Sequence, residues 1–339
     1  MTTGLWGVTS GISGATVTAA TPPACRRSIT TIGAARPRLS PSGVVLEGPE
    51  WPIATATHFV PSFAALTDVP YSLRLELSVR VGGAWSPWAA GATLGPAAFE
   101  SAVPIDALAV DIDVFTSRAP VEAARLRVRL REGESAAVLG APWMLTLSAF
   151  EPSARPGPAA GSLVPGIHIA VPPRSQMDAE AAIANRVCSP TCVAMLLDFW
   201  RRPVTFEALI AEMFHPALDL YGVWPAAIRA AGRRGLAGYL LRFPDWPAAA
   251  WCLAQGLPII ASIRYGAGEL TGAAASQTPG HLIVLTGWDG EMVLANDPAA
   301  PSAAQAARRY RLDELERVWL ARAGMGFVIF PPDLPLRGA

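Results

Sequence analysis

A stretch rich in proline and glycine divides the chain into two parts whose residue patterns differ. It runs from residue 151 to 166 and contains four prolines and three glycines, so it cannot hold a regular hydrogen-bonded ladder. Before this stretch, short segments alternate apolar and polar side chains; after it, helical spacing comes first and strands follow. We therefore predict a linker at 151–166 between two domains, which is the usual number for a chain of 339 residues.

The first domain is expected at residues 44–150, after an irregular segment at residues 1–43. Three segments, at 72–81, 109–114 and 125–131, alternate apolar and polar residues as half-buried strands do. The outward residues of the second segment are acidic and those of the third are arginines, so these two strands are expected to pair in one sheet. Several short strands joined by glycine and proline turns predict an antiparallel β-sandwich.

Two tryptophans, Trp85 and Trp88, are the candidates for a binding feature in this first domain. They could stack on sugars, but packing against the sheet is the simpler interpretation. The sequence identifies no ligand or partner for the domain.

The second domain is expected at residues 167–332. Helical spacing is seen near residues 190–200, 205–214, 224–234, 246–255 and 312–320, and strand patterns near 258–264, 281–288, 291–296 and 325–330. Helices that precede an antiparallel sheet are typical of an α+β fold.

Charge and hydrophobicity exclude some classes of protein. The 27 basic and 27 acidic residues balance, which argues against a nucleic-acid partner. No apolar run reaches the roughly 18 residues that a membrane span needs, and the first residues lack the basic region of a secretory signal. We therefore expect no membrane span and a cytoplasmic location by default, or secretion if the start site is wrongly assigned.

Cys188 stands directly before a predicted helix. Ser189 is expected to be the N-cap, Pro190 suits the first helical position, and the residues that follow are apolar as far as Trp200. A thiol at a helix N-terminus is favoured as thiolate by the helix dipole. The alternative is that Cys188 is only a small buried residue. Cys192 lies one turn later and is expected in the core; with no ligand partners nearby, neither a metal nor another cofactor is predicted.

Residues 279–298 predict a β-hairpin that turns at Asp289 and Gly290. If residues 288–290 form a three-residue loop, or if a bulge compensates for another loop, His281 and Asp297 lie on one face within side-chain reach. With a two-residue loop they face opposite sides of the sheet. His281 could also merely end a strand, with Asp297 in a simple turn.

Taken together, Cys188, His281 and Asp297 supply a nucleophile, a base and an acid that orients the base. These stretches resemble the motif set of the papain-like bacteriocin-processing peptidases. The likeness rests on Gln176, Cys188-Ser-Pro-Thr, Gly280-His281-Leu-Ile-Val-Leu and Asn296-Asp297-Pro298, and it covers residues 167–332 well. It is greatest for the free-standing branch, in which a β-rich N-terminal domain precedes the peptidase domain.

The resemblance implies a papain-like peptidase domain with three catalytic side chains. It assigns the nucleophile to Cys188, the base to His281 and the orienting acid to Asp297. It also implies a glutamine that donates to the oxyanion, for which Gln176 is the candidate. In the members fused to transporters, glycine usually follows the cysteine and the glutamine lies closer to it; here Ser189 follows the cysteine.

We expect a cysteine peptidase that cleaves a peptide or protein substrate through a thioester. The double-glycine leaders that the transporter-fused members cleave are not expected as substrates, because no membrane span is predicted here. Two other interpretations stay open: an amidase or acyltransferase that uses the same three residues, and a non-catalytic peptide-binding protein on a peptidase scaffold. An inert Cys188 thiol would favour the last of these.

Overall fold

The computed structural model describes residues 3–33, 37–40, 43–153 and 166–334, so most of the predicted linker lies outside the described residues. The chain forms two compact units. Unit 1 holds the described residues up to 153 together with Val223–Leu241, and unit 2 holds the described residues from 166 to 222 and from 242 to 330.

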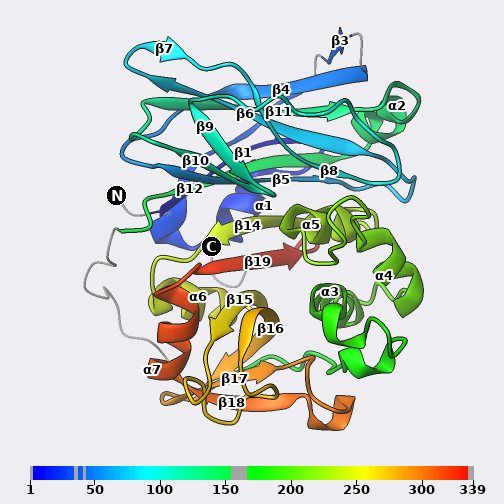
Figure 1. The fold of residues 1–339 in the computed structure, drawn as a ribbon, viewed down its shortest axis with the longest axis vertical. Coiled ribbons are helices and arrows are strands. Elements are labelled where there is room, and N and C mark those ends of the chain that lie inside the picture. The colour runs from blue at the N-terminus through cyan, green and yellow to red at the C-terminus, as the bar shows by residue number, and fades with distance from the viewer. Residues whose placement is uncertain (1–2, 34–36, 41–42, 154–165, 335–339) are drawn as a thin grey trace. The chain divides into compact units, whose positions relative to one another are not determined.

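Unit 1 is β-rich and contains two sheets (Figure 1). One sheet has the strand order β2-β1-β12-β5-β10-β9; the other has the order β3-β4-β11-β6-β7, with β8 also paired to β6. Strands β1 and β2 are parallel, whereas β1 and β12 and the pairs around β11 are antiparallel. The strands are β1 (Thr3–Ser10), β2 (Arg26–Thr31), β3 (Arg38–Ser40), β4 (Gly43–Pro52), β5 (His58–Ala65), β6 (Leu73–Val81), β7 (Ala84–Trp85), β8 (Ala89–Leu94), β9 (Leu108–Asp111), β10 (Val114–Ser117), β11 (Ala123–Leu130) and β12 (Trp143–Phe150). The helices α1 (Gly14–Ala19) and α2 (Glu132–Gly140) and the short η1 (Pro23–Cys25) complete this part.

Both sheets contribute side chains to one apolar cluster. Leu75 and Leu77 of β6 and Phe59 and Phe63 of β5 are among its members, and each is almost fully buried. Full burial of such a side chain contributes about 1.5–3 kcal/mol to the free energy of unfolding. This shared cluster is therefore the main source of stability in unit 1.

The expectation of an irregular segment at residues 1–43 is wrong. Strand β1 pairs with β12 along its whole length, from Thr3 opposite Phe150 to Ser10 opposite Trp143. Consecutive residues of β1 are buried, because both faces of this strand are covered. Such a strand lacks the apolar–polar alternation that marks a half-buried strand, so the sequence pattern does not reveal it.

The expected strand at 109–114 is two strands. Strand β9 ends at Asp111, Ile112 takes a positive φ of 57°, and β10 begins at Val114, so the segment is a tight hairpin. The expected pairing with the arginine-rich segment at 125–131 is also wrong, because β9 and β10 lie in one sheet and β11 lies in the other.

The arginines of β11 find their acidic partner on β6 instead. Arg127 Nη2 lies 2.5 Å from Glu76 Oε2, and Arg129 Nε lies 3.0 Å from Glu76 Oε1. Arginines of β11 also cover the two tryptophans: the guanidinium of Arg125 lies 4.0 Å from the ring centre of Trp85, and that of Arg127 lies 4.1 Å from the ring centre of Trp88. These contacts favour packing against the sheet over a sugar platform.

Helix α5 (Trp224–Gly232) and most of strand β14 (Ala237–Arg242) belong to unit 1, although they lie within the range 167–332 that was predicted for the second domain. Arg229 of α5 donates from Nε and Nη2 to the carbonyl oxygen of Tyr71, at 2.9 and 2.6 Å. Contacts so distant in sequence leave no local pattern, which is why the boundary was not predicted.

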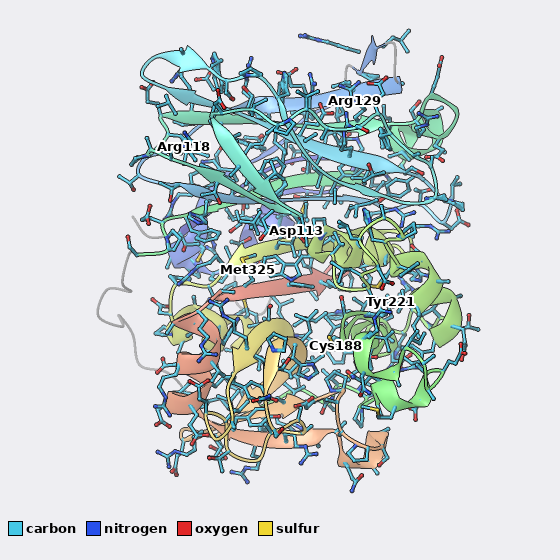
Figure 2. All side chains as sticks on the ribbon, viewed as in Figure 1. Asp113, Arg118, Arg129, Cys188, Tyr221 and Met325 are labelled. Carbon is cyan, nitrogen blue, oxygen red and sulfur yellow. The ribbon has the colours of Figure 1, made fainter. Side chains whose placement is uncertain are left out.

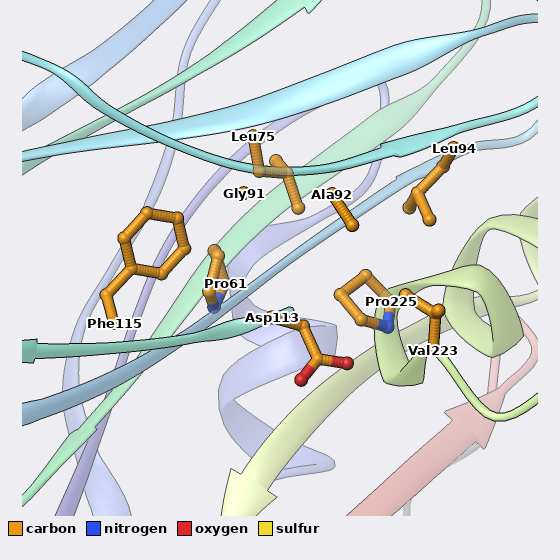
Figure 3. Close-up of a pocket in the computed structure, with 9 residues that line it drawn as sticks. All are labelled: Pro61, Leu75, Gly91, Ala92, Leu94, Asp113, Phe115, Val223 and Pro225. Atoms are coloured by element: carbon orange, nitrogen blue, oxygen red, sulfur yellow. The ribbon is translucent and has the colours of Figure 1, made fainter. Parts of the chain in front are cut away.

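A carboxylate from the β9–β10 turn caps helix α5. Asp113 Oδ2 accepts the backbone N–H of Trp224 at 2.6 Å, beside Val223 and Pro225 (Figure 3). The first N–H groups of a helix have no partner within the helix, so an oxygen placed here satisfies one of them. Burial raises the pKa of Asp113 to about 7, although the N–H of Trp224 acts in the opposite direction.

Unit 2 combines helices with a sheet of order β19-β15-β16-β17-β18, in which β13 also pairs with β16 (Figure 1). Its helices are η2 (Gln176–Asp178), η3 (Ala184–Arg186), α3 (Cys188–Phe199), α4 (Phe206–Met213), α6 (Trp246–Ala254), η4 (Ala303–Gln305) and α7 (Leu312–Leu315), which continues as the π-helix η5 (Glu316–Leu320). Its strands are β13 (Ile167–His168), β15 (Ile259–Tyr265), β16 (Thr278–Trp288), β17 (Met292–Asn296), β18 (Ala307–Arg311) and β19 (Met325–Phe330). The predicted elements lie within a few residues of these bounds, but β13 and β18 were not predicted. In the described ranges, no helix has the length and apolar character needed to cross a membrane.

Candidate active site

Cys188 is the first residue of helix α3 (Figure 2). The N-cap is Val187 and not Ser189, whose buried hydroxyl has no hydrogen-bond partner among the described residues. Pro190 therefore occupies the third helical position, where it is still tolerated because the first-turn N–H groups need no partner in the helix. Cys188 thus lies two residues further into the helix than predicted and still lies at the positive end of the helix dipole.

Helix α3 is held rigidly by its surroundings. The residues from Ser189 to Leu197 are all buried, and Trp200 after the helix donates its indole N–H to Ile329 O at 2.9 Å. Cys188 itself is partly exposed, whereas Cys192 is fully buried. Cys188 is therefore the more accessible of these two cysteines.

The hairpin of β16 and β17 brings His281 and Asp297 to one face, but not through the predicted three-residue loop. Trp288 belongs to β16 and pairs with Val293, a register that would leave His281 and Asp297 on opposite faces. The register shifts between Leu285 and Gly287, so the pairs beyond this bulge bring the two residues back to the same face. The sequence predicted that His281 and Asp297 share a face if the hairpin has either a three-residue loop or a compensating bulge. The structure has the bulge.

The bulge coincides with the contact of β13 against β16. Thr286 O accepts the N–H of Ile169 at 2.7 Å, and His168 pairs with Gly287. A Cβ on Gly287 would lie 2.2 Å from the carbonyl oxygen of Ile167, so only glycine permits this approach.

A chain of hydrogen bonds connects Cys188, His281 and Asp297. His281 Nε2 lies 2.7 Å from Asp297 Oδ1, and the imidazole also hydrogen-bonds the Cys188 thiol. Because Nε2 faces Asp297, Nδ1 is the nitrogen left for the thiol. His281 is 7% exposed and Asp297 is fully buried, so water competes little for these bonds.

The three groups shift one another's pKa values. Burial raises the pKa of the Cys188 thiol, but the hydrogen bond and positive charge of His281 and the N–H groups of Leu282 and Ser189 outweigh it and lower the pKa overall. Burial lowers the pKa of His281, but the bonds to Asp297 and Cys188 raise it above its ordinary value. The arrangement therefore favours a thiolate and an imidazolium over a neutral pair.

Asp297 has two further donors that the sequence did not reveal. The hydroxyl of Tyr310 on β18 donates to Asp297 Oδ2 at 2.7 Å, and the backbone N–H of Ala299 donates to Oδ1 at 2.9 Å. Burial raises the pKa of Asp297, but the bonds to His281, Tyr310 and Ala299 lower it overall. The only sequence signal for Tyr310 is one aromatic residue among the arginines of β18.

Gln176 lies in η2 and is buried. Its backbone N–H donates to Pro298 O at 2.8 Å, so it adjoins the segment that carries Asp297. Its side-chain Oε1 has no hydrogen-bond partner among the described residues, and Gln176 makes no hydrogen bond to Cys188 there. Its predicted role in oxyanion binding stays a prediction.

The second thiol near the site differs from the first. Cys192 Sγ donates to Leu282 O at 3.3 Å, and burial together with the charges of Cys188 and Asp297 raises its pKa well above the ordinary value. Within the described ranges, no group of three or more histidine, cysteine or acidic residues is arranged to hold a metal ion.

Residues 168–326, just under half of the chain, match the model of the Peptidase_C39 like family, and this region includes Cys188, His281 and Asp297. No curated protein matches the chain. Among solved structures, the chain is similar to a double glycine motif protease from an AMS/PCAT transporter, crystallised in complex with the leader peptide. The two are 16% identical with a TM-score of 0.32, and the match covers 53% of this chain and 99% of that chain.

Proposed function

We propose that Cys188, His281 and Asp297, which lie in the region that matches the Peptidase_C39 like family, are a catalytic triad that cleaves peptide bonds through a thioester. The family match supports a cysteine peptidase, and the proposal adds which residues act and how.

The first half of the proposed reaction forms the acyl-enzyme. The Cys188 thiolate attacks the carbonyl carbon of the scissile peptide bond, and the carbonyl oxygen takes up the negative charge. The imidazolium of His281 then gives its proton to the leaving nitrogen, the C–N bond breaks, and the amine product leaves a thioester on Cys188. Asp297 holds the imidazole in orientation and stabilises its positive charge.

The second half releases the acid. Neutral His281 takes a proton from water, the hydroxide adds to the thioester carbonyl, and the C–S bond breaks to restore the Cys188 thiolate beside an imidazolium. In both halves the oxyanion needs donors, and the backbone N–H of Cys188 and the side-chain amide of Gln176 are the proposed ones.

The hydrogen-bond chain from thiol to carboxylate carries the proposal. A buried Cys–His contact alone is compatible with a structural role, but here a buried carboxylate 2.7 Å from His281 Nε2 fixes the ring and favours its charged form. Cys188 at the other end is a partly exposed residue whose thiol has a lowered pKa, as a nucleophile requires.

A peptide library tests the proposed function. Purified protein is incubated with the library, new N-termini are read by mass spectrometry, and a parallel reaction with a peptide aldehyde traps Cys188. We expect cleavage by the wild type and none by Cys188→Ala. Trapping without cleavage, with turnover only of simple amides or only when an amine acceptor is added, would favour the amidase or acyltransferase. Peptide binding with neither trapping nor cleavage would favour the binding protein.

We also propose that unit 1 is a β-sandwich. The support is the single apolar cluster to which both sheets contribute, for example through Leu75 of β6 and Phe63 of β5. Alanine at either position should destabilise unit 1, by about 2–5 kcal/mol, as expected for a large side chain removed from a shared core.

A further inference from the structure

We propose that Tyr310 is a positioning residue of this site, which holds the Asp297 carboxylate in the orientation that His281 requires. The inference rests on the proposed triad and adds a fourth side chain to it.

Each of the two carboxylate oxygens of Asp297 has its own hydrogen-bond donors. Oδ1 accepts from His281 Nε2 and from the N–H of Ala299, and Oδ2 accepts from the Tyr310 hydroxyl at 2.7 Å. The backbone of Asp297 is also held, because its N–H donates to Ala306 O at 2.8 Å. Of these donors to the carboxylate, only Tyr310 bonds the oxygen that faces away from His281, so its hydroxyl fixes the rotation of the carboxylate.

The position of Tyr310 in the fold makes it a rigid donor. It lies in β18 opposite Val293 of β17, and it is fully buried while its neighbours in the strand, Arg309 and Arg311, are largely exposed. Burial and the negative charge of Asp297 raise the pKa of Tyr310 far above its ordinary value. The hydroxyl therefore keeps its proton, and keeps donating it to Asp297, at every pH at which Cys188 and His281 change their charge.

Loss of this hydroxyl would act on the thiol through two steps. Without a donor on Oδ2 the buried carboxylate has an unsatisfied oxygen, and rotation toward another donor would weaken its bond to His281 Nε2. A less well-held imidazolium stabilises the thiolate less, so the pKa of Cys188 would rise and its reaction with electrophiles would slow.

The chain offers a matched control in Tyr265. This second tyrosine is also buried, and the charge of Asp297 contributes to raising its pKa to about 12. Its hydroxyl, however, donates to Ala275 O at 3.2 Å and not to the carboxylate. Tyr265→Phe therefore removes a buried hydroxyl near Asp297 without removing a donor from it.

The test is a double-mutant cycle read by the alkylation rate of Cys188. Iodoacetamide labelling is followed site by site by mass spectrometry from pH 5 to 10, at 10 °C, in Tyr310→Phe, Tyr265→Phe, Asp297→Ala and the double variant Tyr310→Phe/Asp297→Ala. We expect Tyr310→Phe to slow labelling at pH 6.5 by about tenfold and to move the half-ionisation pH of Cys188 upward. Tyr265→Phe should match the wild type, and Tyr310→Phe should have no further effect once Asp297 is alanine.

Two results would overturn the inference. The first is a Cys188 labelling rate in Tyr310→Phe equal to that of the wild type. The second is an equal slowing of labelling by Tyr310→Phe in the wild-type and in the Asp297→Ala background, which would mean that the hydroxyl serves packing alone. If circular dichroism shows Tyr310→Phe to be unfolded, 3-fluorotyrosine at position 310 replaces it; this residue keeps the hydroxyl but makes it more acidic. A changed half-ionisation pH for Cys188 then supports the inference and an unchanged one overturns it. Failure of the triad itself would look different, because the wild type would then label no faster than His281→Ala.

Discussion

The protein buries a carboxylate among strong hydrogen-bond donors in two places, and the donors differ. In unit 1, Glu76 is 2% exposed and is bonded by three arginines, Arg74, Arg127 and Arg129. In unit 2, Asp297 is fully buried and is bonded by an imidazole, a phenol and a backbone N–H. In both places burial raises the pKa of the carboxylate and the donors lower it overall.

The difference lies in what the donors can do with a proton. A guanidinium keeps its proton at any accessible pH, so the arginines around Glu76 cannot pass a proton to it and only hold the strands together. An imidazole can give its proton to a neighbour and take it back, and the neighbour here is the thiol of the partly exposed residue Cys188. The first arrangement is therefore expected to matter for stability and the second for chemistry.

The largest expected effect is the loss of all chemistry on removal of the thiol. Cys188→Ala should abolish peptide cleavage and covalent labelling while the thermal unfolding midpoint stays near that of the wild type, because the thiol is not part of the core. Cys192→Ala is the matched control: it should lose about 1–2 kcal/mol of stability through a small cavity but keep both activities. Cleavage that survives in Cys188→Ala would assign the activity to another group.

The next effect is on unit 1. Glu76→Gln leaves three buried or half-buried guanidinium groups without their carboxylate and should lower the free energy of unfolding by about 3–5 kcal/mol, measured by urea denaturation. The alkylation rate of Cys188 at 10 °C should not change. The control is Glu50→Gln on strand β4 of the same sheet; its side chain is 45% exposed and pairs with Arg80, so the loss should be below about 1 kcal/mol. A changed labelling rate in folded Glu76→Gln would remove the distinction between the two regions.

A third buried carboxylate sharpens the comparison, because none of the groups that shift the pKa of Asp113 in the described part of the chain is a cation. Burial raises its pKa to about 7, so between roughly pH 4 and 7 the native state holds a proton that the unfolded chain releases. Stability from this group is therefore greatest at low pH and is lost as pH rises through 7. Asp113→Asn keeps an oxygen for the N–H of Trp224 but cannot ionise, so at pH 8 it should be more stable than the wild type, by roughly 2–4 kcal/mol.

The pH dependence separates this account from a simple packing effect. The advantage of Asp113→Asn in urea denaturation should shrink on going from pH 8 to pH 5. A variant that is equally destabilised at both values would show that the carboxylate of Asp113 is ionised throughout and contributes as a charged cap.

The smallest effect is expected for an exposed pair. Asp313 and Arg317 lie four residues apart with N and O atoms at 3.2 Å, and both side chains are more than half exposed. Arg317→Gln should change the free energy of unfolding by no more than about 0.5 kcal/mol at low salt and less at high salt. A loss comparable to that of Glu76→Gln would mean that burial does not set the strength of these pairs.

The sequence predicts the second unit better than the first, for a physical reason. Helix α3 and the strands β15, β16 and β17 each carry their own local pattern, and the motif residues fall on them. In unit 1, strand β1 is buried on both faces and so lacks alternation, and the acidic segment at 109–114 looks like one strand because a tight turn at Ile112 needs no glycine.

Two features of the site lie beyond sequence patterns. The bulge before Gly287 depends on the approach of β13, and the bond from Tyr310 to Asp297 depends on the pairing of β17 with β18. Both are contacts between segments whose own sequences give no sign of the partner. The contact of His281 with Asp297 was predicted only as one of several registers, since a shift by a single residue reverses the face.

The most direct test of the account compares the alkylation of Cys188 in the wild type and in His281→Ala from pH 5 to 10. The lowered pKa of Cys188 depends on His281, so the wild type should react well below the roughly 8.5 at which a free cysteine ionises, and His281→Ala should shift the profile to that value or above. Cys192 should react slowly in both until the protein unfolds, because it is buried and its pKa is raised. Identical profiles for Cys188 in the two proteins would contradict the account, since the thiol would then be an ordinary cysteine beside a histidine that does nothing for it.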